Sequence, residues 1–205
     1  MRIAVFGASR GVGAQILPQA VDREWGVKAL SRVASAIPEI PGVQVIEGNV
    51  LDPGAVFRTL DGCDAAVLSL GRTKNNPATV VSDGTEIVIQ VMNKLGVRRL
   101  VAVTSLGVGD SETMLPFHIK LLMKSVLKRA IQEKQRQEEL IAASGLEWVI
   151  VRPARLTDGP YTGRYAAGLR ESEAGEGRVS RADVADFVLN NISDDRYLHS
   201  TPFVM

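Results

Sequence analysis

Three glycines near the start of the chain have the spacing of a phosphate-binding turn. Gly7, Gly11 and Gly13 form the pattern G-x-x-x-G-x-G, directly after an apolar run at residues 2–6 and before a helical pattern. Such glycines let a chain turn sharply off a strand, bring backbone N–H groups close to a pyrophosphate and pack a helix closely on a sheet. The free N–H groups of the helix N-terminus also attract anions. The segment predicts a dinucleotide-binding unit; the alternative is a glycine-rich turn without a ligand.

Two arginines flank the expected ribose position of this unit. A second predicted strand, residues 27–30, ends at Ser31 and Arg32, where a site for NAD has an acidic residue that binds the ribose 2′-hydroxyl. Arg32 has no acid beside it, and Arg10 in the glycine turn is a second cation nearby. A guanidinium group suits a 2′-phosphate because its donors form a planar fork. We therefore expect NADPH (NADP+) as cofactor, with solvated surface charges as the alternative for both arginines.

The rest of the chain supplies the elements that must position these residues. Further strands are predicted at residues 43–46, 65–70, 100–104 and 146–151, of which residues 65–70 are almost continuously apolar. Helical patterns cover residues 53–60, 77–95, 118–144 and 181–190, with a capping box at Ser180 and Asp183. This alternation predicts an α/β fold with a Rossmann-type, doubly wound parallel sheet in a single domain, residues 1–205. Residues 159–177 are predicted as loop, and residues 201–205 as a final edge strand.

Ligands of such sheets bind at the carboxyl ends of the strands, which selects further candidates. Asn49 and Val50 follow the third strand, where Asn49 can bond the adenine edge and Val50 can pack on it. An Asx turn is the alternative for Asn49. Gly71 and Arg72 follow the fourth strand, and Gly71 either lets the backbone approach the nicotinamide ribose or is a plain turn glycine.

The expected nicotinamide end of the site lies after the fifth and sixth strands. Thr104 and Ser105 end the fifth strand; the Ser105 hydroxyl can orient a substrate or carry a proton, or merely cap the turn. Pro153 and Ala154 leave the sixth strand and are expected to pass the nicotinamide. Arg155 can then meet a phosphate or carboxylate of cofactor or substrate.

An apolar cluster between these strands is a candidate substrate roof. It includes Leu115 and Phe117, which can cover a flat aromatic molecule or belong to the core. The helical pattern that follows is rich in Lys and Arg, Lys134 among them, and we interpret this basic run as a solvated helix face.

The chain lacks the Tyr-x-x-x-Lys motif with which most short-chain reductases protonate a carbonyl substrate. None of the three tyrosines has lysine four residues later, and Lys134 has Ala130 four residues before it. Without an enzymic acid, the hydride acceptor must be conjugated enough to stabilise the resulting anion, as flavins, quinones and linear tetrapyrroles are. We therefore expect such a small molecule as substrate.

Composition excludes several other classes. The net charge of +1 gives no polyanion-binding surface, so we expect no nucleic-acid partner. No apolar run is long enough to span a membrane, and residues 2–6 start a strand, so we expect neither a membrane anchor nor a signal peptide. Cys63 is the single cysteine, and no metal-ligand spacing is present, so we expect a cytoplasmic protein without metal. We also expect a monomer.

At this point the chain resembles the NADPH-dependent biliverdin IXβ reductase/flavin reductase family of atypical short-chain dehydrogenase/reductases, which includes NmrA-like proteins. The shared features span nearly the whole chain: residues 3–8, Arg32, residues 48–50, 70–71, 77–84, 104–105, 144–146, 160–163 and 199–201. The resemblance implies that Ser9, Arg10 and Val12 join the glycines around the pyrophosphate, and that Leu70 and Leu156 line the nicotinamide side. Arg10 and the pair Ala154-Arg155 depart from the family pattern. The second departure leaves the substrate open, because that corner of the site touches it.

These features support an NADPH-dependent oxidoreductase that passes a hydride to a flavin, such as FMN or riboflavin, or to biliverdin. The alternative is a catalytically weak NADP(H)-sensing regulator of NmrA-like type, since the missing tyrosine fits both. A nucleotide-sugar epimerase is a third hypothesis, weakened by the missing tyrosine and by the short C-terminal part.

Overall fold

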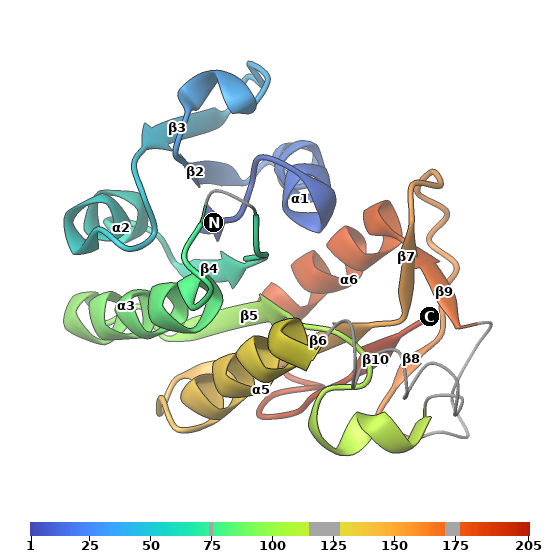
Figure 1. The fold of residues 1–205 in the computed structure, drawn as a ribbon. Helices are drawn as coiled ribbons and strands as arrows, with labels where there is room; N and C mark the ends of the chain where they lie inside the picture. Colours follow the sequence, from blue (N-terminus) through green and yellow to red (C-terminus); the bar gives the residue numbers. More distant parts are fainter. Residues whose placement is uncertain (74–75, 115–127, 171–176) are drawn as a thin grey trace.

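A mostly parallel eight-stranded sheet forms the centre of the molecule (Figure 1). A computed structural model of the chain describes residues 1–73, 76–114, 128–170 and 177–205. The strands follow the order β3-β2-β1-β4-β5-β6-β10-β8, and only β8 is antiparallel to its neighbour. Their bounds are β1 (Arg2–Phe6), β2 (Gly26–Ser31), β3 (Val43–Glu47), β4 (Ala65–Leu68), β5 (Arg99–Val103), β6 (Glu147–Pro153), β8 (Ala167–Gly168) and β10 (Phe203–Val204). The strand order reverses between β1 and β4, which is where ligands bind in such sheets.

Helices cover both faces of the sheet. On one face α1 (Gly11–Asp22) packs against α6 (Arg181–Ser193), and on the other α3 (Val80–Leu95) packs against α2 (Pro53–Leu60) and α5 (Lys128–Ala142). Two short 3-10 helices, Ala34–Ala36 and Gly109–Met114, and a separate parallel pair, β7 (Arg155–Thr157) with β9 (Arg178–Ser180), complete the described elements. The predicted α/β fold, a Rossmann-type, doubly wound parallel sheet, is confirmed.

Two hydrophobic cores, one on each face of the sheet, explain why the central strands are apolar at nearly every position. In β1, Ile3 and Val5 are fully buried in the core under α1 and α6. Ala4 and Phe6 are equally buried in the core under α2, α3 and α5. Because a strand covered on both faces must be apolar on both, the central strands β1, β4 and β5 show little alternation, whereas β3 at the edge has exposed polar residues.

Local capping interactions set several helix boundaries, and the predicted capping box at Ser180 and Asp183 is among them. The Asp52 side chain accepts a hydrogen bond from Gly54 N at 2.9 Å at the start of α2. Ser180 Oγ accepts one from Asp183 N at 2.9 Å at the start of α6. Gly96 ends α3 in the left-handed conformation, with a φ of +73°, which costs glycine little.

Three sequence-based expectations need correction. The last strand is not an edge strand, because β10 is parallel to β6 on one side and antiparallel to β8 on the other. Helix α3 begins at Val80 rather than Pro77, since residues 77–79 form a turn in which Val80 N donates to Pro77 O at 3.3 Å. The loop predicted at residues 159–177 contains the short strand β8. Of the helix predicted at residues 118–144, the described part is α5, and residues 115–127 lie outside the described residues.

Candidate functional site

A cavity of about 1370 Å³ lies over the carboxyl ends of the central strands, at the point where the strand order reverses. It brings together residues that are far apart in the sequence. Of the predicted site residues, the cavity is lined by Gly7, Ser9, Arg10, Gly11, Val12, Arg32, Asn49, Val50, Leu70, Gly71, Arg72, Thr104 and Leu156. The volume and the polar residues at its rim suit an extended dinucleotide better than a small metabolite.

The backbone of the glycine turn packs so closely on β4 and α1 that Gly7 and Gly13 leave no room for a side chain. Gly7 has a φ of +86°, and a Cβ atom on it would lie 2.7 Å from the carbonyl carbon of Ser69 at the end of β4. A Cβ on Gly13 would lie 2.8 Å from the carbonyl carbon of Gly7, so Gly13 holds α1 against the turn rather than lining the cavity. Gly11 has a φ of +62° and nothing within 4 Å of its Cβ position, which leaves open space over it.

The N-terminus of α1 is open to an anion. Arg10 occupies the N-cap position with extended backbone, and no side chain caps the helix. The first turn of α1 also contains no acidic residue. The backbone N–H groups at Gly11, Val12 and Gly13 therefore lack helical acceptors and point with the positive end of the helix dipole toward the cavity. This donor set fits a dinucleotide pyrophosphate.

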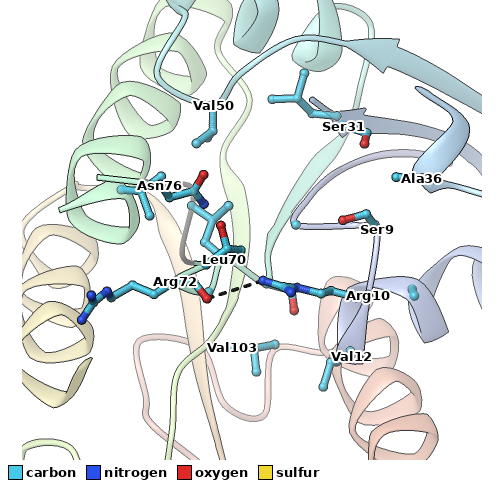
Figure 2. A pocket seen from close by; sticks show the side chains of 18 of the residues that line it. Ser9, Arg10, Val12, Ser31, Ala36, Val50, Leu70, Arg72, Asn76 and Val103 are labelled. Carbon is cyan, nitrogen blue, oxygen red and sulfur yellow. Dashed lines mark hydrogen bonds between the residues drawn. The ribbon is translucent and has the colours of Figure 1, made fainter. Parts of the chain in front are cut away.

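Arg10 and Arg32 both reach the loop that follows β4. Arg10 Nη2 lies 3.5 Å from Arg72 O, so its side chain crosses from the glycine turn to this loop (Figure 2). Arg32 Nη1 donates to Asn76 Oδ1 from the carboxyl end of β2. Sequence reasoning placed both arginines near the adenosine ribose and, by resemblance, Arg10 also at the pyrophosphate. Both line the cavity, and the Arg10 side chain points toward the loop after β4. Their ligand roles stay predictions.

Asn49 and Val50 form the wall between β3 and α3. Asn49 Oδ1 accepts a hydrogen bond from Leu51 N at 3.1 Å, which is the Asx turn considered as an alternative. Since the oxygen is used, the Asn49 amide retains its NH₂ group for a ligand. Val50 packs so closely on α3 that a Cβ on Gly84 would lie 2.8 Å from Val50 Cγ1.

Lys134 is a cavity residue that sequence reasoning placed on a solvated helix face. Its Nζ donates to Leu70 O at 2.8 Å, to Val103 O at 2.9 Å and to Gln137 Oε1 at 3.0 Å. The half-buried ammonium thus joins the carboxyl ends of β4 and β5. Burial lowers the pKa of Lys134 to about 8, despite the nearby carboxylate of Glu138. The sequence signal for a buried Lys134 was its spacing of four residues from Glu138, which puts both on one helix face. The hydrogen-bond acceptors of Lys134 include two backbone carbonyls, and these cannot be recognised from residue types.

A buried polar cluster supports the wall behind Thr104. Thr104 Oγ1 donates to Glu138 Oε1 at 2.7 Å, and Arg152 binds both oxygens of Glu138, at 3.1 and 2.7 Å. Arg152 Nη1 also donates to Asp110 Oδ1 at 2.5 Å. Bonding to Arg152 holds the pKa of Asp110 below its usual range. The cluster ties α5 to the ends of β5 and β6 and so fixes the cavity wall.

Several predicted site residues lie elsewhere. Ser105, Pro153, Ala154 and Arg155 are not among the cavity-lining residues of the described chain. The Ser105 hydroxyl donates to Leu106 O at 3.1 Å, Ala154 packs near the end of β10, and Arg155 is exposed in β7. Their catalytic and ligand roles stay predictions.

Leu115 and Phe117, the proposed roof, lie outside the described residues. Within the described chain, no cluster of His, Cys, Asp and Glu could hold a metal ion, and no helix is long and apolar enough to cross a membrane.

The Rossmann-type sheet has a glycine turn with free N–H groups at the point where the strand order reverses. These features place the chain among NAD(P)-binding proteins with an oxidoreductase-like fold. The chain belongs to the NAD(P)H-binding family, whose model matches residues 7–195.

Individual proteins that resemble this chain share a low sequence identity with it. The anaerobilin reductase ChuY of Escherichia coli O157:H7 is 28% identical, with a TM-score of 0.84 over 100% of this chain and 97% of that one. A protein of Bacillus subtilis named as the uncharacterized sugar epimerase YhfK is 24% identical over 95% of this chain and 89% of its own length. A short-chain dehydrogenase/reductase of Veillonella parvula, solved in complex with NADP, is 15% identical with a TM-score of 0.82, covers 99% of this chain and 93% of that one, and shows only the shared fold.

Proposed function

We propose that this protein is an NADPH-dependent oxidoreductase that reduces a conjugated acceptor, a flavin or a biliverdin-like linear tetrapyrrole. The observation that carries the proposal is the joint placement of the uncapped α1 N-terminus and Arg32 in one cavity. The N-terminus of α1 can bind the pyrophosphate of a dinucleotide, and Arg32 can bind its 2′-phosphate. The cofactor supplies a hydride; this chain supplies the surface that binds and orients it.

The proposed preference for NADPH over NADH rests on charge. Within the described chain, no carboxylate is paired with Arg32, and no acid follows β2 that could bond a ribose 2′-hydroxyl. Arg10, Arg72 and Lys134 add positive charge to the same cavity. A ligand with a pyrophosphate and a further phosphate fits this excess better than one with a pyrophosphate alone.

The proposed acceptor class rests on the residues that line the cavity where we expect the nicotinamide. Leu70, Val103 and Leu156 give an apolar wall, and no tyrosine lines the cavity among the described residues. A flat π-system can lie against such a wall, accept two electrons and one proton as hydride, and take its second proton from water. The likeness to a protein described as an anaerobilin reductase supports a tetrapyrrole or a comparable acceptor. It also supports the finer resemblance to biliverdin IXβ reductase/flavin reductase.

Anaerobic mixing tests the proposal and separates a reductase from an NADP(H) sensor. The protein is loaded with NADPH, and FMN, riboflavin, biliverdin and a quinone are added separately, with protein-free mixtures as controls. We expect matched loss of NADPH and of the oxidised acceptor with at least one of them. Tight NADPH binding without any such loss would favour the regulator. A cytoplasmic location and a monomeric state, measurable by fractionation and light scattering, belong to the same proposal.

A further inference from the structure

Asn76 and Arg32 meet at the rim of the cavity although 44 residues separate them in the chain. Arg32 follows β2, and Asn76 lies between β4 and α3. Figure 2 shows the Asn76 side chain among the residues that line the cavity. The Arg32 guanidinium donates to the Asn76 side-chain oxygen. An exposed arginine otherwise samples many rotamers, so a fixed acceptor selects one arrangement of its donors before any ligand binds.

The backbone around Asn76 makes it a firm support. Asn76 N donates to Thr73 O at 3.2 Å, and Thr73 follows Gly71 and Arg72 and lines the cavity with them. Pro77 follows and restricts the backbone of Asn76, and α3 begins three residues later at Val80. The backbone of Asn76 is therefore held by Thr73 on one side and restricted by Pro77 on the other.

The partner of Arg32 leaves its charge available. An amide oxygen occupies one of the five guanidinium N–H donors and carries no compensating charge. The acid closest in register, Glu47 opposite Ser31, instead accepts a hydrogen bond from Ala34 N at 3.1 Å. Within the described residues no carboxylate lies within ion-pair distance of Arg32. The arginine is thus held in place and still positively charged.

We propose that Asn76 is a positioning residue that sets the preference for a 2′-phosphorylated dinucleotide by holding Arg32 toward the ribose end of the cavity. The inference rests on the proposed use of NADPH. Asn76 acts through Arg32, so it should affect ligands with a 2′-phosphate and leave ligands without one nearly unchanged. A carboxylate at the same position would pair with Arg32 and repel the phosphate.

The test compares Asn76→Ala and Asn76→Asp with the wild type. NADPH, NADH, adenosine 2′,5′-bisphosphate and 5′-AMP are titrated by calorimetry, so the readout is binding rather than turnover. Asn93→Asp is the matched control, because Asn93 is exposed on α3 and does not line the cavity. We expect the NADPH-over-NADH affinity ratio to fall about threefold to tenfold in Asn76→Ala and more than about tenfold in Asn76→Asp. The ratio for the two adenosine phosphates should fall in parallel.

Each outcome has a defined meaning. A wild type that binds NADPH no better than NADH overturns the proposed cofactor preference itself, and the inference with it. A wild type that prefers NADPH while both Asn76 variants keep the full preference overturns the role of Asn76 alone. Equal loss of all four ligands in Asn76→Ala would make Asn76 a structural residue of the loop and would also overturn the inference.

Discussion

The ammonium group of Lys134 donates a hydrogen bond of 2.9 Å to the carbonyl oxygen of Val103, the last residue of β5. The same nitrogen bonds the carbonyl oxygen of Leu70, just beyond β4. Carbonyls at the ends of parallel strands lack their next ladder partner, and here a side chain from α5 satisfies two of them. The floor of the cavity between β4 and β5 is therefore held by a helix that contributes little else to it.

Replacing Lys134 tests this arrangement. Lys134→Met should lower the free energy of unfolding by about 1–3 kcal/mol, since it leaves two carbonyls without a donor. Lys128→Met, an exposed position at the start of α5, is the control and should change it by less than about 0.5 kcal/mol. Denaturant unfolding measures both. Equal effects would show that the hydrogen bonds of Lys134 add no stability.

Lys134 should also make stability depend on pH. Its pKa of about 8 in the folded protein lies below the usual value of 10.5, so the unfolded chain binds more protons between these values. The cost of burying the charged lysine is fully present below about pH 8 and is relieved as the pH rises toward about 10.5. The wild type should gain stability relative to Lys134→Met over this window. A constant difference would contradict the lowered pKa.

Glu138 should be essential to the fold. Glu138 and Arg152 are both buried, so Glu138→Ala leaves Arg152 with Asp110 as its remaining carboxylate partner. We expect this change to lower the free energy of unfolding by about 3–5 kcal/mol. The neighbouring Glu139 is exposed, and Glu139→Ala should cost about 0.5 kcal/mol or less. Thermal melts of the two variants give the comparison. Similar melting temperatures would show that the cluster does not hold α5 to the sheet.

The glycine turn offers a steric test. Gly13→Ala places a Cβ against the Gly7 carbonyl, so α1 must move away from the turn, with loss of both stability and NADPH affinity. Gly11→Ala meets no atom within 4 Å and adds only the strain of a φ of +62°, about 1–2 kcal/mol. Calorimetric melting and titration should rank Gly13→Ala as clearly worse. The reverse order would mean that the helix does not pack on the turn as described.

Three signals, one in the site and two at helix starts, are local and follow from the sequence. The glycine pattern, Asp52 before Pro53 and the Ser180–Asp183 pair act within a few residues, so their geometry follows from residue type and spacing. The contacts of Lys134, and the place of β10 between β6 and β8, depend on segments that the fold brings together. Backbone carbonyls carry no residue-specific signal, and a two-residue strand contains too little pattern to reveal its neighbours.

Arg32 should discriminate between the two cofactors. Arg32→Ala should weaken NADPH binding about tenfold to a hundredfold and NADH binding by less than about threefold, because only NADPH carries the 2′-phosphate. Arg58→Ala, at an exposed site on α2, is the control. Fluorescence titration of the reduced cofactors gives the affinities. Equal losses for both cofactors would remove the assigned role of Arg32.

Ser105 lies just past Thr104, which lines the cavity, but its own hydroxyl bonds Leu106 O. If the hydroxyl turns to orient the acceptor, Ser105→Ala should slow hydride transfer by about twofold to tenfold with an unchanged NADPH affinity. Single-turnover mixing separates the two quantities. An unchanged rate would make Ser105 a residue of the turn alone.

The most direct test of hydride transfer from NADPH is the steady-state oxidation of NADPH and of NADH with FMN as acceptor, followed by the loss of reduced-nicotinamide absorbance against a protein-free blank. We predict protein-dependent oxidation with kcat/KM for NADPH at least about tenfold above that for NADH, which corresponds to roughly 1.4 kcal/mol of differential binding in the transition state. If FMN, riboflavin, biliverdin and quinones all leave NADPH oxidation at the blank rate, the reductase assignment is contradicted. Equal rates with both cofactors would contradict the role of Arg32 at the ribose.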